Sequence, residues 1–70
     1  MKYYNSLTTR ESEVLQLISH GLTTKEIASS LFLSSHTVDS HRKRLMEKMD
    51  ARNTAVMIRL GFEAGILKLN

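Results

Sequence analysis

Two helical patterns separated by only three residues constrain this 70-residue chain more than any other feature. The first pattern opens with Thr23 and Glu26 at the Ser/Thr-x-x-Glu spacing of a capping box, and Ile27, Ala28 and Leu31 then give it one apolar face. In the break, Phe32-Leu33-Ser34, two apolar residues can pin the corner to the core and Ser34 can cap the next helix. We therefore expect a helix-turn-helix corner whose second helix spans about 35–49.

The expected helix 35–49 has two chemically different faces. Its core stripe consists of Val38, Leu45 and Met49, and its opposite side carries Asp39, Ser40, Lys43, Arg44 and Glu47. A helix of this kind fits the B-DNA major groove, where donors and acceptors on base edges distinguish all four base pairs. We therefore predict that Asp39, Ser40 and Lys43 contact bases. The alternative is the ordinary solvated face of a surface helix, and the short capped turn before it favours DNA reading.

Further motifs stand at matching spacings along nearly the whole chain. They are Leu7-Thr8-Thr9-Arg10-Glu11 with Glu13-Val14-Leu15, Gly21, Lys25-Glu26-Ile27-Ala28 with Leu31, Ser34 with Thr37-Val38 and His41, Lys48-Met49, and Gly65-Ile66-Leu67. In these residues the chain resembles the LuxR-type DNA-binding domains at the C-terminus of many bacterial response regulators and quorum-sensing receptors. The resemblance implies an all-α, compact four-helix bundle, with its third helix in the major groove and its fourth a common dimer contact, and it implies transcription control.

The resemblance also implies roles for individual residues. By position, the family's base-contacting sites fall at Asp39, Ser40 and Lys43, in agreement with the helix periodicity. The expected contacts to the DNA backbone are Thr24, Lys25, Thr37 and His41, to which we add Arg44 on the outward helix face. For His41 the alternative is a partly buried histidine that holds the turn together.

Two positions depart from the family pattern. Thr54 stands where the family often carries an arginine, with Arg52 two positions early, so the usual ion pair of that arginine is in doubt. Asp39 stands where many relatives have a basic or neutral side chain, and phosphates repel a carboxylate unless it accepts from a cytosine amino group or pairs with a neighbour. The alternative to a specificity role for Asp39 is therefore a surface pair with Lys43, worth about 0.2–0.5 kcal/mol.

Composition narrows the function classes. Ten Lys and Arg residues against seven Asp and Glu give a net charge of +3, which weakly favours a polyanionic partner. The placement of the cations is more informative, because Arg42, Lys43, Arg44 and Lys48 cluster in the helix 35–49. The chain has no cysteine, and His36 and His41 are too far round a helix to converge, so we expect no metal site. No phosphate-binding loop or nucleophile motif is present, and we expect neither an enzyme nor a cofactor.

The remaining chain supplies two more helices. We expect residues 1–6 to form a flexible lead or linker stub and residues 7–70 to form the domain. Thr8 with Glu11 should cap a helix over about 9–20, whose apolar residues are Val14, Leu15, Leu17 and Ile18 and which Gly21 ends. Asn53 should cap a last helix over about 54–64, ended by Gly65. A close approach of another helix would rationalise Gly61.

The last helix is apolar on more than one side. Ala55, Ile58 and Phe62 make one stripe, and Val56 and Leu60, with Met57 as a candidate, make another. One stripe can close the core, and a second would be a surface that a monomer seldom leaves exposed. We therefore predict a homodimer whose interface consists of Val56, Arg59, Leu60 and Glu63. The alternative is that the core takes up the whole helix.

These observations predict a sequence-specific DNA-binding transcriptional regulator that binds double-stranded DNA as a dimer. RNA polymerase is a further candidate partner. No apolar run approaches the roughly 20 residues that span a bilayer, so we expect no membrane partner and a cytoplasmic location at the bacterial nucleoid. The alternatives are a promoter-binding fragment like that of a sigma factor, and a protein-interaction module that has lost DNA binding.

Overall fold

The computed structural model describes residues 7–69, and this part of the chain contains four helices and no strand. They are α1 (Thr9–Ser19), α2 (Thr24–Leu31), α3 (Ser35–Lys48) and α4 (Thr54–Glu63). The helical ends agree with the expected ones to within one residue, which confirms the all-α fold. The predicted lead at 1–6 lies outside the described residues, as does residue 70. None of the four helices is long and apolar enough to cross a membrane.

Every helix begins at the side-chain cap that the sequence predicts. The capping residues are Thr8, Thr23, Ser34 and Asn53, each of which accepts a hydrogen bond from the backbone N–H three residues later. Thr8 and Thr23 form complete capping boxes, because the carboxylates of Glu11 and Glu26 accept in turn from the N–H of each cap. A cap of this kind stabilises a helix by about 0.5–2 kcal/mol. The four caps therefore fix where the helices start.

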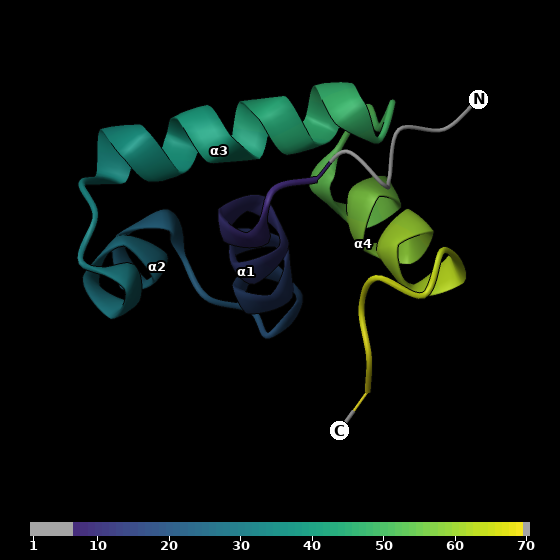
Figure 1. Cartoon of the computed structure of the whole chain (residues 1–70), viewed down its shortest axis with the longest axis horizontal. Coiled ribbons are helices and arrows are strands. Elements are labelled where there is room, and N and C mark those ends of the chain that lie inside the picture. Colours follow the sequence, from purple (N-terminus) through teal and green to yellow (C-terminus); the bar gives the residue numbers. More distant parts are fainter. Residues whose placement is uncertain (1–6, 70) are drawn as a thin grey trace.

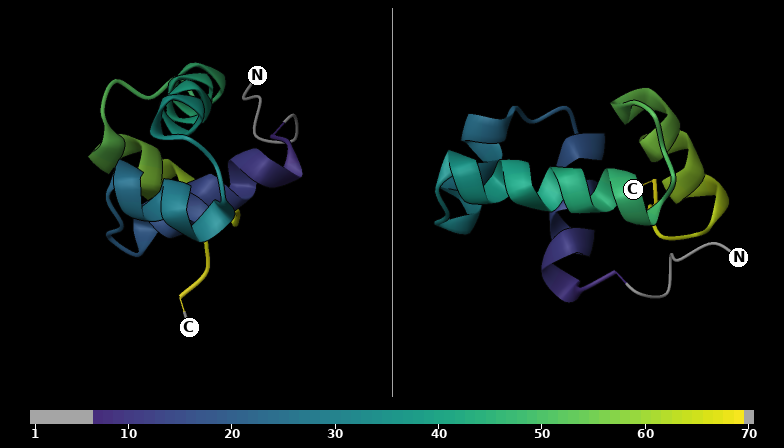
Figure 2. Two further views of the ribbon diagram at one scale, coloured as in Figure 1. Left: turned by 90° about the vertical axis from the view of Figure 1, so that its left-hand side faces the viewer. Right: turned by 90° about the horizontal axis from the view of Figure 1, so that it is seen from above.

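Helix α3 runs along one side of the molecule and packs on all three other helices (Figure 1). Seen from that side, it crosses over α1 and no other described segment covers it (Figure 2). Its expected stripe of Val38, Leu45 and Met49 is fully buried. These side chains meet a core that the other elements supply through Val14, Leu15, Ile18, Ile27, Ala28, Met57 and Leu67. The opposite face of α3 is left to solvent.

The corner between α2 and α3 turns through a left-handed residue. Phe32 has φ 58° and ψ 42°, and the N–H of Leu33 donates to the carbonyl of Ala28 at 2.9 Å. Leu33 packs against the core, as expected. The expectation that Phe32 also anchors the corner is wrong, because its side chain is 95% exposed. The left-handed turn directs only one of the two apolar side chains inward.

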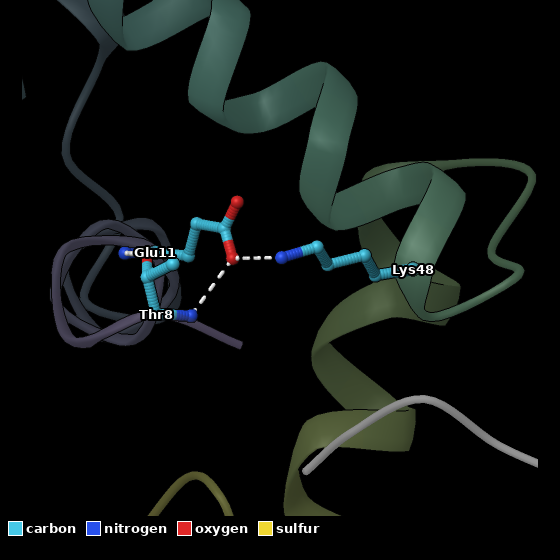
Figure 3. A network of polar contacts seen from close by, with 3 residues as sticks. All are labelled: Thr8, Glu11 and Lys48. Atoms are coloured by element: carbon cyan, nitrogen blue, oxygen red, sulfur yellow. Dashed lines mark hydrogen bonds and ion pairs between the residues drawn. The ribbon is translucent and has the colours of Figure 1, made fainter. Parts of the chain in front are cut away.

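A buried ion pair ties the C-terminal end of α3 to the start of α1 (Figure 3). Lys48 Nζ lies 2.8 Å from Glu11 Oε1, and the Glu11 side chain is 2% exposed. The same oxygen accepts from the Thr8 N–H at 2.9 Å. Burial opposes ionisation of Glu11, but the hydrogen bonds from Lys48 and the Thr8 backbone and the charge of Lys48 outweigh it and lower the pKa of Glu11. Glu11 is thus both a cap and an anchor for α3.

The core-facing side of α4 coincides with neither predicted stripe as a whole, because it takes Ile58 from one stripe and Leu60 and the candidate Met57 from the other. Met57 is 1% exposed and Gly61 is buried, whereas Ala55 and Phe62 are exposed. Gly61 does permit a close approach: a Cβ there would lie 2.7 Å from Leu67 Cδ1 and 3.5 Å from Leu15 Cδ2. The expected helix-to-helix contact is therefore mainly a contact with Leu67, which follows α4 and folds back over it.

Candidate nucleic-acid interface

The three residues predicted to contact bases lie together on the uncovered side of α3. Asp39 and Lys43 are exposed and Ser40 is half-buried. All three border one groove of about 450 Å³ between α3 and the start of α4. The groove is lined by His36, Asp39, Ser40, Arg42, Lys43, Met46, Thr54 and Met57. The arrangement presents a carboxylate, a hydroxyl and an ammonium group to the same patch of solvent.

Asp39 is held by the neighbouring helix. The hydroxyl of Thr24, the first residue of α2, donates to Asp39 Oδ1 at 3.4 Å. The ion pairs found within residues 7–69 do not include the pair between Asp39 and Lys43 that was the alternative interpretation. Asp39 therefore joins the start of α2 to α3, and Lys43 is exposed.

The hydroxyl of Ser40 is engaged within α3 itself. Its Oγ donates to the carbonyl oxygen of His36, one turn earlier, at 3.2 Å. The only proton of the hydroxyl is therefore used within the helix, and its oxygen keeps lone pairs that can accept a hydrogen bond.

The residues predicted to contact the DNA backbone lie on the other flank of α3 and at the start of α2. At 3.6 residues per turn, Thr37, His41 and Arg44 share a flank. Arg44 and Lys25 are exposed, whereas Thr24, Thr37 and His41 are half-buried. Thr37 Oγ1 lies 2.9 Å from Ser34 Oγ in a solvent-exposed contact, whereas His41 Nδ1 is buried without a hydrogen-bond partner.

Two of the four clustered cations have partners inside the fold, which the sequence did not reveal. Lys48 pairs with Glu11, and Arg42 donates to Thr54 Oγ1 at 3.5 Å. Thr54 is the position where an arginine was expected, so here the cation stands on α3 and the acceptor on α4. The cations that remain on the solvent side of α3 are Lys43 and Arg44.

The four predicted dimer residues follow one side of α4. Arg59 and Glu63 are exposed and form an ion pair with 3.6 Å between Nη1 and Oε2. Val56 and Leu60 are half-buried, and Leu60 also packs against the core. Met57, the further candidate for this stripe, belongs to the core instead. The dimer interface stays a prediction.

Comparison with known proteins identifies relatives of this domain. The family model described as bacterial regulatory proteins, luxR family, matches residues 5–60. The response regulatory protein YgeK of Escherichia coli, itself uncharacterised, is 47% identical over 62 residues, which are 89% of this chain and 42% of YgeK. BvgA of Bordetella pertussis, named a putative positive regulator of virulence-factor transcription, is 43% identical over 54 residues, covering 77% of this chain and 26% of BvgA. The chain thus spans less than half the length of these relatives.

Two solved structures share the fold. The transcription factor GerE superposes with a TM-score of 0.86 at 31% identity, covering 91% of this chain and 96% of GerE. VqmA of Vibrio cholerae, in a complex with ligand and DNA, superposes with a TM-score of 0.80 at 35% identity, covering 86% of this chain and 26% of VqmA.

Proposed function

The chain belongs to the luxR family of bacterial regulatory proteins, and on that premise we propose that it binds double-stranded DNA sequence-specifically, with α3 in the major groove. The observation that carries this proposal is the uncovered face of α3, where Asp39, Ser40 and Lys43 share one groove. A helix lying in the major groove reads sequence through such a row of donors and acceptors.

Phosphate contacts would set the register of the reading helix. Lys25 and Arg44 are exposed cations on α2 and α3. The first N–H groups of a helix lack intrahelical partners and favour anions. Because the Thr24 hydroxyl donates to Asp39, we propose that Thr24 contributes its backbone N–H to a phosphate rather than its side chain. Thr37 and His41 complete the proposed set on the flank of α3.

We further propose that two copies act together. Val56, Arg59, Leu60 and Glu63 run along one side of α4, and a two-fold contact between two such helices would place two reading helices on half-sites about one DNA turn apart. Recruitment of RNA polymerase is the step by which such a dimer on a promoter would regulate transcription.

Selection of bound duplexes from random DNA, followed by affinity measurement, tests the proposed function. Lys43→Ala should weaken binding to the selected duplex by about 1–3 kcal/mol and binding to random duplex less, because lysine can donate to guanine O6 and N7. Lys68→Ala is the matched control, since Lys68 is an exposed cation beyond α4. Equal losses on both duplexes would make Lys43 a phosphate contact, and the absence of any enriched sequence would overturn sequence-specific binding.

A further inference from the structure

The hydrogen bonds within the groove decide which base edges the helix can recognise. Ser40 has one O–H proton, and that proton goes to the His36 carbonyl at 3.2 Å. Toward DNA, Ser40 can then act only as a hydrogen-bond acceptor through the lone pairs of its oxygen. Ser40 is thus an acceptor in this fold, although a serine hydroxyl is in general both donor and acceptor.

Asp39 is also a hydrogen-bond acceptor, and a stronger one than Ser40 because it is charged. A carboxylate can only accept hydrogen bonds, and one of the two oxygens of Asp39, Oδ1, already accepts from the Thr24 hydroxyl at 3.4 Å. The side chain is exposed beside Ser40 in the groove, so its second oxygen remains available to a ligand. Lys43, one turn further along α3, has the opposite polarity, because an ammonium group only donates.

The major groove offers few groups that can donate to an acceptor. Cytosine presents its N4 amino group and adenine its N6 amino group, whereas guanine and thymine present acceptors. In adenine the acceptor N7 lies next to the amino group on the same base and repels the second oxygen of a carboxylate, whereas cytosine itself presents no acceptor beside its amino group. A carboxylate therefore prefers cytosine, and a hydroxyl that only accepts takes either base.

We propose that Asp39 and Ser40 act as acceptors that select bases with an exocyclic amino group, cytosine at Asp39 and cytosine or adenine at Ser40, while Lys43 selects guanine. This inference rests on the proposed function, because it assumes that α3 lies in the major groove. Asp39 and Lys43 are four residues apart, about 6 Å along the helix axis. At about 3.4 Å per base pair, the selected cytosine and guanine lie within two base pairs of each other.

Replacing one oxygen of the Asp39 carboxylate by an amide nitrogen tests directly whether this side chain acts as an acceptor. In Asp39→Asn, the amide side chain would be isosteric with the carboxylate but carry a donor as well as an acceptor, which suits adenine N6 and N7. Selection from random DNA with this variant should therefore replace cytosine by adenine at one position and leave the others unchanged. Glu47→Gln makes the same chemical change at an exposed residue of α3 outside the groove, and it should leave the selected sequence as it is.

A second test removes the donor from the DNA. Replacing the N4 amino group of the selected cytosine with hydrogen should weaken binding of the unaltered protein about fivefold to 150-fold. The same replacement should hardly affect Asp39→Ala, which has lost the acceptor. Ser40→Ala should abolish the preference at the neighbouring amino-bearing base while the cytosine at the Asp39 position persists.

The outcomes separate the inference from the proposed function. If the unaltered chain enriches a sequence but Asp39→Asn and Ser40→Ala enrich the same one, the acceptor assignment is overturned and sequence-specific binding stands. If the unaltered chain enriches nothing, both are overturned. Thermal unfolding of each variant, followed by circular dichroism, verifies that these surface changes leave the fold intact.

Discussion

Replacing Lys48 by methionine tests how strongly the buried pair with Glu11 holds α3 in place. The variant keeps an unbranched chain but leaves the Glu11 carboxylate, 2% exposed, without its counter-charge. Removing one partner of a buried pair costs about 3–5 kcal/mol. Protonation of the Glu11 carboxylate can reduce part of this cost. For a group with an ordinary pKa of 4.5, protonation at pH 7 costs about 3.4 kcal/mol.

We therefore expect Lys48→Met to lose about 3 kcal/mol at pH 7. That is a large share of the roughly 4–10 kcal/mol typical of a domain this size. Glu11→Gln should cost less, about 1 kcal/mol, because glutamine still completes the capping box and the Lys48 side chain, already 29% exposed, can turn to water. The asymmetry follows from the different burial of the two partners.

The stability of the unaltered chain and that of Lys48→Met should change with pH in opposite directions. In the unaltered chain the pKa of Glu11 is lowered, so its contribution is present above the ordinary value of 4.5 and is lost as the pH falls through the folded value. In Lys48→Met, burial without the lysine should raise the pKa of Glu11, so that variant loses stability as the pH rises above 4.5. The difference between the two proteins should thus narrow from pH 7 to pH 4.5.

Urea unfolding followed by circular dichroism at both pH values measures these differences. A loss below about 1 kcal/mol at pH 7, or a difference that is the same at both pH values, would refute the reasoning.

Three further predictions concern the surface and α4. Lys25→Ala should weaken binding to all duplexes alike and reduce the slope of log affinity against log salt by about one unit, and an unchanged slope in a salt titration would remove Lys25 from the interface. Val56→Asp should yield a folded monomer that binds a two-half-site duplex much more weakly, and we choose it over Leu60→Asp because Leu60 packs against the core. Sedimentation that finds the unaltered chain monomeric both free and on DNA would contradict the dimer. Gly61→Ala should lower the free energy of unfolding by about 1 kcal/mol, because its Cβ would lie 2.7 Å from Leu67 Cδ1, and a urea midpoint at or above that of the unaltered chain would show that Leu67 moves aside freely.

The starts of the helices were predictable because their signals are local. Thr8 and Thr23 each stand three residues before a glutamate, and the structure contains both complete capping boxes. The orientation of α4 was not predictable in the same way. Nearly every side of that helix carries an apolar residue, so periodicity does not distinguish Met57, which is buried, from Phe62, which is 36% exposed.

In the candidate site, too, features set by nearby residues were predictable, and contacts between residues distant in sequence were not. The outward position of Lys43 follows from the period of α3 alone. The partners of Asp39 and Lys48 do not, because Thr24 and Glu11 lie 15 and 37 residues away in sequence. An acidic residue four positions before a lysine suggested a local pair, and only the packing of α2 against α3 brings the Thr24 hydroxyl within reach of Asp39.

Helix α3 has a polar contact with each of the other helices: Asp39 with Thr24 on α2, Arg42 with Thr54 on α4, and Lys48 with Glu11 in the first turn of α1. If α3 is the reading helix proposed above, these contacts restrain its orientation before DNA binds. Association with DNA should then cost little backbone conformational entropy, and the entropic cost should fall mainly on the exposed side chains proposed to contact DNA, among them Lys25, Lys43 and Arg44. Loosening the restraint at Arg42 or Lys48, which lie outside the proposed set of DNA contacts, should therefore weaken DNA binding through entropy and leave the proposed contacts in place.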